Sequence, residues 1–225
     1  MIVSSFAAPA YATNCWVIAP SAGSEGIIID PGMSLDGDTD LRDEVADLLA
    51  ENKIKPVAVI ATHGHLDHIF SIRAVADGYG IPSYIHSGDR ELFTHPERAL
   101  SPAFAATLAQ SEFIEPADVR ELRSGQVVEL LGMSITAMHA PGHTKGSMIF
   151  TIDDELLVSG DVLFAGSIGR TDLPGGSMSE MTQTLQKKIL PLSDHLRVLP
   201  GHGPETTIGI ERKSNPYLQK LGYQK

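Results

Sequence analysis

The stretch Val57-Ala58-Val59-Ile60-Ala61-Thr62-His63-Gly64-His65-Leu66-Asp67-His68 decides how the rest of the sequence is interpreted. Its first five residues are apolar and typical of a buried strand, so the histidines follow directly on the end of that strand. Three imidazoles and a carboxylate are costly to bury together without a charged partner, and all four are groups that bind divalent transition metals. Gly64 allows a turn that aims His63 and His65 at one point, with Asp67 and His68 at a neighbouring point. The stretch therefore predicts a metal site.

The order His-x-His-x-Asp-His after a hydrophobic strand resembles the signature of metallo-β-lactamase-fold hydrolases. The rest of the sequence contains the other ligands that this family uses, in three motifs: Pro141-Gly142-His143-Thr144, Ser159-Gly160-Asp161 and Pro200-Gly201-His202-Gly203. Each motif lies where a strand gives way to a glycine-bearing turn. At such a place a rigid element presents a ligand and a loop leaves room for substrate.

The resemblance implies two divalent metal ions, with zinc expected and iron or manganese also compatible with nitrogen and oxygen ligands. It implies one ion held by His63, His65 and His143, a second held by Asp67, His68 and His202, and Asp161 as the bridge between them. Asp67 and Asp161 are the expected catalytic residues, because a ligating carboxylate can also orient the hydroxide that attacks the substrate. The fold implied is α/β (α+β), a four-layer αββα sandwich with the metals at one edge between its sheets.

The composition is that of an ordinary globular protein, with 225 residues, 42% hydrophobic and 20% charged. We expect one hydrolase domain over residues 1–225. The formal net charge of −11 offers no general field for nucleic acid or an anionic membrane. Met1 to Thr13 lacks the basic residues and long apolar core of a signal peptide, so a cytoplasmic protein is expected. The single cysteine, Cys15, excludes an internal disulfide and is interpreted as a small buried hydrophobe.

Hydrophobic periodicity predicts the secondary structure around these motifs. The N-terminal part, from Ile2 to Ile29, is expected to form a β meander, followed by a helix from Asp38 to Glu51 and an amphipathic helix after His68. The later strands are expected at Pro82 to His86, Val119 to Leu122, Gln126 to Leu131, Met133 to Met138, Ser147 to Ile152 and Glu155 to Val158. A helix begins at the capping box of Ser177 and Glu180, with an apolar stripe of Met178, Met181, Leu185 and Ile189.

Three features are left open by the sequence. Residues 87–116 contain a short helix beginning at Ser101-Pro102, which is either a lid over the site or a surface excursion, and the surface excursion is favoured. Asp30 closes the third strand and is a candidate to support the metal site from behind. His139 either orients His143 or is a half-buried strand residue, and the second interpretation is favoured.

The subfamily depends on residues 164–176, with the pattern F-x-G-x-x-G-R-x-D-x-P-G-G. This pattern is similar to short glyoxalase II-like proteins and to the related persulfide dioxygenases, in which a basic residue at the position of Arg170 lies near the thiol-borne substrate. Arg170 is therefore the expected substrate-binding residue, because a guanidinium suits a carboxylate-bearing thiol carrier. The alternative is a structural arginine tied to Asp172. Only about twenty residues follow His202, too few for the helical C-terminal domain of larger glyoxalase II enzymes.

These observations predict a metal-dependent hydrolase that cleaves thioesters of a low-molecular-weight thiol by a metal-bound hydroxide. The first alternative is a mononuclear iron persulfide dioxygenase, which would use His63, His143 and Asp161. A flavodiiron-like redox protein is disfavoured, because that family usually has Glu at the position of His65 and no flavin domain follows. The expected partner is a small-molecule thioester, and nothing in the sequence distinguishes a monomer from a homo-oligomer.

Overall fold

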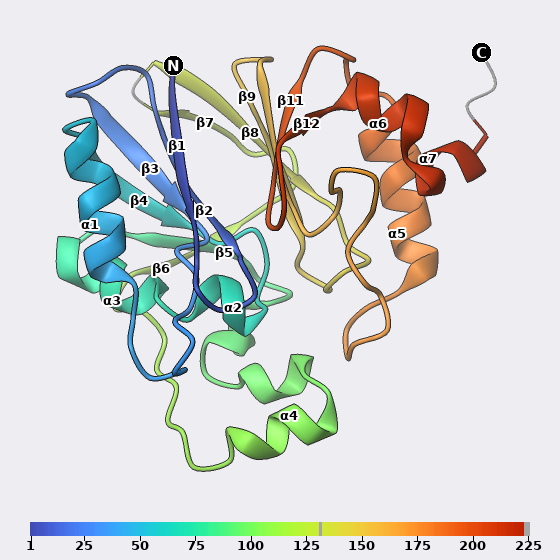
Figure 1. Ribbon diagram of the computed structural model, residues 1–225. Helices are drawn as coiled ribbons and strands as arrows, with labels where there is room; N and C mark the ends of the chain where they lie inside the picture. Colours follow the sequence, from blue (N-terminus) through green and yellow to red (C-terminus); the bar gives the residue numbers. More distant parts are fainter. Residues whose placement is uncertain (131, 223–225) are drawn as a thin grey trace.

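The computed structural model describes residues 1–130 and 132–222 as two mixed β-sheets packed face to face, with helices on both outer sides (Figure 1). The predicted four-layer αββα sandwich is confirmed. The first sheet runs in the order β1-β2-β3-β4-β5-β6 and the second in the order β12-β11-β10-β9-β8-β7. Each sheet is therefore built from one half of the chain, and any contact between the sheets joins residues that are distant in sequence.

The first sheet begins with the predicted meander, because β1, β2 and β3 pair antiparallel, and continues with parallel pairs from β3 to β6. Its strands are β1 Ile2–Ala7, β2 Asn14–Ala19, β3 Glu25–Ile29, β4 Lys55–Ile60, β5 Ser83–His86 and β6 Val119–Leu122. The second sheet is antiparallel except where β10 pairs with β11. Its strands are β7 Val127–Leu130, β8 Met133–His139, β9 Met148–Ile152, β10 Leu156–Gly160, β11 Arg197–Pro200 and β12 Thr206–Thr207.

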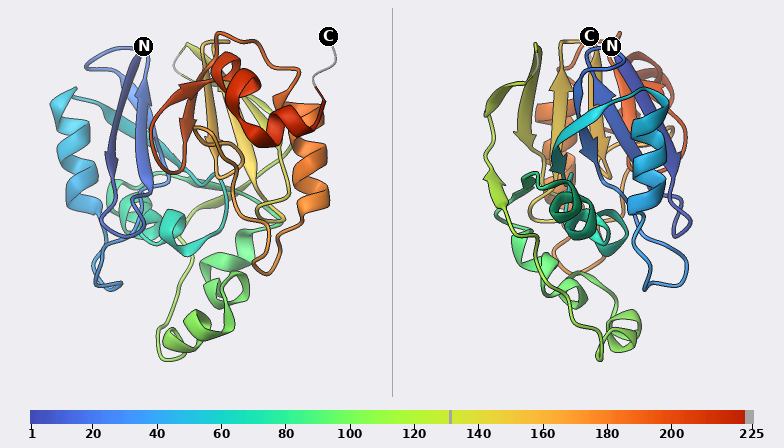
Figure 2. Two further views of the ribbon diagram at one scale, coloured as in Figure 1. Left: turned by 45° about the vertical axis from the view of Figure 1, so that its right-hand side comes forward. Right: turned by 90° about the vertical axis from the view of Figure 1, so that its left-hand side faces the viewer.

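Helices cover the outer face of each sheet, as the views in Figure 2 show. Those of the first half are α1 Arg42–Glu51, α2 Leu66–Ile69, α3 Ile72–Tyr79, the 3₁₀ turns η1 Arg90–Phe93 and η2 Pro96–Ala99, and α4 Pro102–Thr107. Those of the second half are α5 Met178–Thr184, the π-helical turn η3 Leu185–Ile189, α6 Ile208–Ser214 and α7 Pro216–Lys220. No helix in residues 1–130 or 132–222 is long and apolar enough to cross a membrane.

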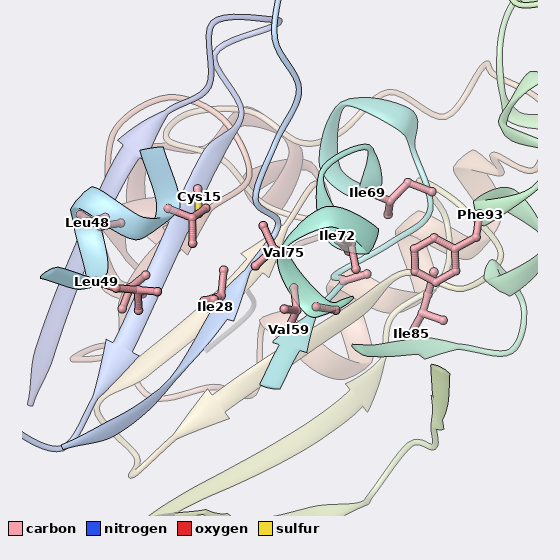
Figure 3. Packing of buried hydrophobic residues seen from close by; sticks show 14 of the residues in the cluster. Cys15, Ile28, Leu48, Leu49, Val59, Ile69, Ile72, Val75, Ile85 and Phe93 are labelled. Carbon is pink, nitrogen blue, oxygen red and sulfur yellow. The ribbon is translucent and has the colours of Figure 1, made fainter. Parts of the chain in front are cut away.

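Three layers of apolar side chains hold the sandwich together. Between the first sheet and its helices, Ile28 and Val59 pack against Val75 and Leu49, and Cys15 is fully buried among them (Figure 3). A second layer fills the space between the sheets, and a third lies between the second sheet and α5 to α7. Burial raises the pKa of the Cys15 thiol, with a smaller contribution from the charge of Asp30. The interpretation of Cys15 as a buried hydrophobe is confirmed.

The predicted helix from Asp38 to Glu51 begins later, at Arg42, and this prediction of its start was wrong. The carboxylate of Asp36 accepts hydrogen bonds from the backbone N–H groups of Asp38 and Thr39, and from the hydroxyl of Thr39. These bonds close a local turn around Asp36, and α1 begins after it, where Oδ1 of Asp40 accepts from the backbone N–H of Arg42. The sequence shows the apolar spacing of a helix but not this separate turn.

The predicted single helix after His68 is two helices, α2 and α3, with a break at Phe70 and Ser71. Both the backbone N–H and the hydroxyl of Ser71 donate to the carbonyl of Gly32, at 3.2 and 2.7 Å, and this contact to another segment interrupts the helix. In α5 and η3, Met181, Leu185 and Ile189 are buried as predicted, but Met178 is 51% exposed and does not belong to the apolar stripe. Ser177 accepts from the backbone N–H of Glu180, as a capping residue does.

The remaining strand predictions agree with the structure to within one or two residues. The C-terminal end of the strand predicted for Gln126 to Leu131 lies outside the described residues, because Leu131 is not among them. His139 ends β8, stacks on His86 with ring centroids 4.1 Å apart, and donates through Nε2 to the carbonyl of Lys145. The interpretation of His139 as a half-buried strand residue is confirmed.

Candidate metal centre

All seven candidate ligands lie just past the carboxyl end of a strand or in the short helix that follows one. After β4, the chain turns at Gly64 and presents His63 and His65, and α2 then carries Asp67 and His68. The other three follow β8, β10 and β11 in turn: His143, Asp161 and His202. Because both sheets end at the same edge, these separate segments meet there, and the structure brings the seven side chains together.

The first cluster, called site one below, consists of His63, His65 and His143, all buried. Nε2 of His63 lies 3.1 Å from Nδ1 of His65 and 3.2 Å from Nε2 of His143. A metal–nitrogen distance of about 2.0–2.1 Å in tetrahedral geometry places ligand atoms about 3.3 Å apart. The three nitrogens therefore have the spacing that one ion requires.

The second cluster, site two, consists of Asp67, His68 and His202. Nε2 of His68 lies 3.2 Å from Nε2 of His202, and Oδ2 of Asp67 lies 3.5 and 3.4 Å from these two nitrogens. The side chain of His68 is fully buried, whereas that of His202 is 26% exposed. Site two thus has the same spacing as site one but mixes charge types and opens towards solvent.

Asp161 lies between the two clusters. Its Oδ2 is 3.4 Å from Nε2 of His143 in site one and 3.4 Å from Nε2 of His202 in site two, and its Oδ1 is 3.5 Å from Nε2 of His68. Oδ1 is buried and receives no hydrogen bond. A buried carboxylate oxygen without a donor is costly, and a cation is the partner that the surrounding donor set suits. The residues present therefore fit two divalent ions joined by Asp161.

The backbone comes very close to this centre at Gly201. A Cβ atom there would lie 2.2 Å from Oδ1 of Asp161 and 2.8 Å from Cε1 of His68. No larger residue fits, so the glycine before His202 allows the end of β11 to pass directly against the bridging carboxylate.

Two imidazoles of site one, those of His63 and His65, have lowered pKa values. Burial lowers the pKa of His63 well below its usual value, and the neighbouring imidazoles add to this effect. Burial, followed by the charge of His143, lowers the pKa of His65 to about 3, against the opposing carboxylates of Asp67 and Asp161. Neutral imidazole is the form that binds a metal, so these two side chains are already in that form.

The side chains of site two form a charged group. Burial alone would lower the pKa of His68, but the carboxylates of Asp67, Asp161 and Asp30 outweigh it and raise the pKa to about 9. Burial is likewise outweighed at His202, where Asp161 and Asp67 raise the pKa to about 10. The pKa of Asp67 is lowered despite burial, because His68 and His202 stabilise its ionised form. Protons on these two histidines therefore occupy the places that an ion would take.

Asp30 supports the centre from behind, as the sequence suggested. Its Oδ2 lies 2.9 Å from Nδ1 of His68 and accepts from the hydroxyl of Thr62 at 2.6 Å, and its Oδ1 accepts from the backbone N–H of Thr62. Asp30, His63 and His68 also lie close enough to count as a potential ligand group. We assign Asp30 to orientation instead, because these hydrogen bonds use both of its oxygens and fix Nε2 of His68 towards site two.

The segment between β1 and β2 holds site two from the other side. The hydroxyl of Thr13 donates to Oδ2 of Asp67 at 2.8 Å, and the carbonyl of Tyr11 lies 3.0 Å from Nδ1 of His202. Tyr11 and Ala12 have φ values of 56° and 54°, in a region that residues other than glycine rarely adopt. No sequence feature singled out Thr13 or Tyr11, because their role depends on contacts with residues 54 and 191 positions away.

The metal centre forms the floor of a cavity of about 550 Å³. Most of its wall is apolar and comes from separate segments: Tyr11, Met33, Leu66, Leu100, Phe104, Phe164 and Leu173. Phe104 of α4 meets the ring of Tyr11 edge to face at 6.5 Å. The segment that includes the predicted short helix therefore forms one wall of the site and is more than a surface excursion.

Arg170 also lines this cavity, but its guanidinium is paired with Asp172. Nε and Nη2 of Arg170 donate to the two carboxylate oxygens of Asp172 at 2.8 and 2.9 Å, and both side chains are largely exposed. The backbone carbonyl of Arg170 has a separate role, because it lies 2.8 Å from Nδ1 of His143 and directs the Nε2 of that ring towards site one. The sequence pattern pointed to the side chain and gave no sign of the carbonyl.

A profile of the metallo-beta-lactamase superfamily matches residues 8–202. The chain belongs to this superfamily. An uncharacterised protein of Mycobacterium tuberculosis is 41% identical over 228 residues, which cover 98% of this chain and 99% of that protein. The hydroxyacylglutathione hydrolase GloC of Haemophilus influenzae is 33% identical over 216 residues, which cover 93% of this chain and 94% of that enzyme.

Solved structures of the superfamily resemble this chain over nearly its whole length. The crystal structure of the B3 metallo-beta-lactamase BLEG-1 has a TM-score of 0.79 at 33% identity, covering 96% of this chain and 99% of that one. The crystal structure of TTHA1623 in a di-iron-bound form has a TM-score of 0.77 at 30% identity, covering 97% of this chain and 100% of that one. The chain thus combines the fold of a superfamily whose members are generally hydrolases with two clusters of His and Asp that could hold metal ions.

Proposed function

We propose that this metallo-hydrolase cleaves thioesters of a low-molecular-weight thiol, in the manner of glyoxalase II. The observation that carries the proposal is the meeting of two three-residue clusters and a bridging carboxylate at the floor of a cavity of about 550 Å³. A cavity of this size takes a small-molecule substrate and excludes a polymer. The similarity to a hydroxyacylglutathione hydrolase over nearly the full length of both chains supports the thioester as the substrate class.

Two divalent ions held by the seven side chains would supply hydroxide at neutral pH and polarise the thioester carbonyl. The residues of the chain do the rest. Asp67 stays ionised because its pKa is lowered, and the hydroxyl of Thr13 fixes one of its oxygens, so the other can accept a hydrogen bond from the attacking water and orient it. Asp30 and the carbonyl of Arg170 hold the rings of His68 and His143 in their ligating orientation.

The cavity wall suggests how the substrate is bound. Its apolar side chains, with Phe104 and Tyr11 at the outer edge, suit the carbon skeleton of an acyl thioester. Arg170 is the cation in the lining, and two of its donors are used by Asp172, which leaves Nη1 for a carboxylate on the thiol carrier. We therefore keep Arg170 as the proposed contact with the carrier, with a modest share of the binding energy.

A complete site two is compatible with a hydrolase that holds two ions, and metal content distinguishes this enzyme from an oxygenase with one iron, which can retain the same residues. Asp67, His68 and His202 have ligand spacing as tight as that of site one, and Asp30 and Thr13 orient two of them. The structure of ETHE1 from Myxococcus xanthus has a TM-score of 0.73 at 23% identity, a likeness of fold alone.

The test is elemental analysis of protein purified without added metal, paired with turnover of a hydroxyacyl thioester of glutathione by the same sample. We expect close to two ions per chain and turnover that chelation abolishes and metal restores. The matched control is Asp161→Asn, which keeps the shape of the side chain and removes its charge. One iron per chain without thioester turnover, and with oxygen consumption in the presence of a persulfide, would replace this proposal by the oxygenase.

A further inference from the structure

Asp89 is a buried acidic residue outside the set of candidate ligands. It lies in the turn between β5 and η1, and only 1% of its surface is exposed. Among the described residues, neither the lining of the 550 Å³ cavity nor any ligand cluster includes it. A carboxylate buried to this extent needs strong hydrogen bonds, so the identity of its donors shows what it holds.

All three of its hydrogen bonds go to the loops that carry the ligands of site one. Oδ2 accepts from the backbone N–H of Gly64 at 2.9 Å and from the hydroxyl of Thr144 at 2.6 Å. Oδ1 accepts from the backbone N–H of Gly146 at 2.7 Å. Gly64 lies between His63 and His65, and Thr144 directly follows His143. One carboxylate therefore ties the loop after β4, in the first half of the chain, to the loop after β8, in the second half.

We propose that Asp89 is a positioning residue for site one, which sets the distance between these two loops and thereby the affinity of the first metal ion. The proposal does not depend on which reaction the centre catalyses. It follows from geometry: His63 and His65 come from one half of the molecule and His143 from the other, so their 3.1–3.2 Å spacing exists only while the two loops are held together. A supporting residue of this kind typically changes metal affinity by about 10- to 100-fold.

On the side of Gly64 and Gly146, the two loops pack closely against Asp89. A Cβ atom on Gly146 would lie 2.6 Å from Cγ of Asp89, and one on Gly64 would lie 3.0 Å from its Cβ. Gly88, next to Asp89, packs against the backbone of Gly146, where a Cβ atom would be 3.2 Å away. The chain thus has glycines where the two loops close around this carboxylate.

Site two has a counterpart in Asp30, which makes the proposal selective. Asp30 contacts His68 of site two through its own hydrogen bond, whereas the bonds recorded for Asp89 all lead to the loops of site one. Loss of the Asp89 carboxylate should therefore weaken site one and leave site two nearly unchanged. A general folding defect would weaken both.

The experiment measures Zn²⁺ affinity by competition with a chromophoric chelator in two backgrounds, His202→Ala, which leaves site one, and His65→Ala, which leaves site two. In Asp89→Asn we expect a 10- to 100-fold loss of affinity in the first background and less than about threefold in the second. An asparagine keeps the size of the side chain but turns an N–H group towards one of the three donors. Asp118→Asn, an exposed aspartate paired with Arg120, is the matched control and should change neither affinity.

An equal loss at both sites, or no loss at either, in Asp89→Asn protein with an unchanged metal-free unfolding temperature would overturn the proposal. If Asp89→Asn does not fold, Thr144→Val carries the same test. It removes one of the three hydrogen bonds, and we expect a several-fold loss confined to the site-one background. Unchanged affinity in folded Thr144→Val protein would overturn the proposal equally.

Discussion

The two metal sites have equivalent ligand spacing but differ in the charge of their histidine rings. In site one, burial keeps the pKa values of His63 and His65 low, and both rings are neutral. In site two, carboxylates raise the pKa values of His68 and His202 to about 9 and 10, and both rings carry protons in the metal-free protein. Site one is therefore ready to accept an ion, whereas an ion at site two must first displace protons.

The difference shows that two neighbouring ions can be bound through different properties of the protein, namely the shape of the loops at one site and the charge of the carboxylates at the other. Site one relies on shape: its loops are fixed by Asp89 and by the carbonyl of Arg170. Site two relies on charge, because Asp67, Asp161 and Asp30 surround its two rings. Variants that remove one supporting residue at a time can therefore separate the contribution of shape from that of charge.

The largest effect is expected for Asp161→Asn, because Asp161 is the residue that both sites share. Both ions should bind more weakly, and kcat/KM for a thioester should fall by more than about a hundredfold, beyond the range typical of supporting residues. The measurement is metal content after dialysis together with steady-state kinetics. Retention of two tightly bound ions would show that the two sites are independent of the bridge.

Asp30→Asn should weaken site two most, because Asp30 contacts His68 directly and reaches site one only through the hydroxyl of Thr62, which lies 3.0 Å from Nδ1 of His63. The neutral amide removes the charge behind His68 and breaks one of the contacts with Thr62. We expect a loss of about 10- to 100-fold in Zn²⁺ affinity in the His65→Ala background. A loss that is equal in the His202→Ala background would remove the distinction between the two supports.

Proton release upon metal binding should differ between the sites. Binding at site two must displace protons from His68 and His202, whose pKa values are raised, so its affinity should rise with pH and more protons should be released per ion at pH 7 than at site one. At site one, the rings of His63 and His65 are neutral at that pH, so metal binding releases no second ring proton from them. Calorimetry in buffers of different ionisation enthalpy measures the proton count. Equal counts in the two single-site backgrounds would contradict the charge difference.

The smallest effect is expected for Arg170→Met, because the guanidinium is exposed and already paired with Asp172. For a thioester with a carboxylate on its thiol carrier, KM should rise roughly two- to fivefold, which corresponds to about 0.5–1 kcal/mol. The KM for a neutral thioester of similar size should change little. The control substitution Lys53→Met, in a segment far from the cavity, should leave the KM for both substrates unchanged. If KM rises by the same factor for both substrates, Arg170 has a structural role and does not contact the carboxylate of the carrier.

The metal centre could be predicted from sequence because its signals are local. The candidate ligands lie in four short motifs, each of which contains a glycine and follows a strand-like stretch, so a window of about ten residues contains each pattern. The fold followed from the same resemblance. Asp89 lies in the segment that the sequence left uninterpreted, and its donors are 25, 55 and 57 positions away, so its role appears only once the sheets are packed.

The errors in the helices have a similar origin. The spacing of Val45, Leu48 and Leu49 correctly located α1, but it does not show that residues 36–39 form a separate turn before α1. In α2 and α3, the apolar period continues across Ser71, while a bond to Gly32 from another part of the chain interrupts the helix. Apolar periodicity reports which face is buried, and polar contacts with distant residues decide where an element stops.

The division of each metal site between the two halves of the chain has a consequence for folding. Neither half of the chain contains all three ligands of site one or all three of site two. An ion therefore finds either site complete only after the sheets have docked. Metal binding then adds its free energy to the docked state, about 2.7 kcal/mol for each ion present at a hundred times its dissociation constant. Metal supply therefore sets the population of opened molecules, and with it the rate at which proteases remove the protein when opening and closing are fast.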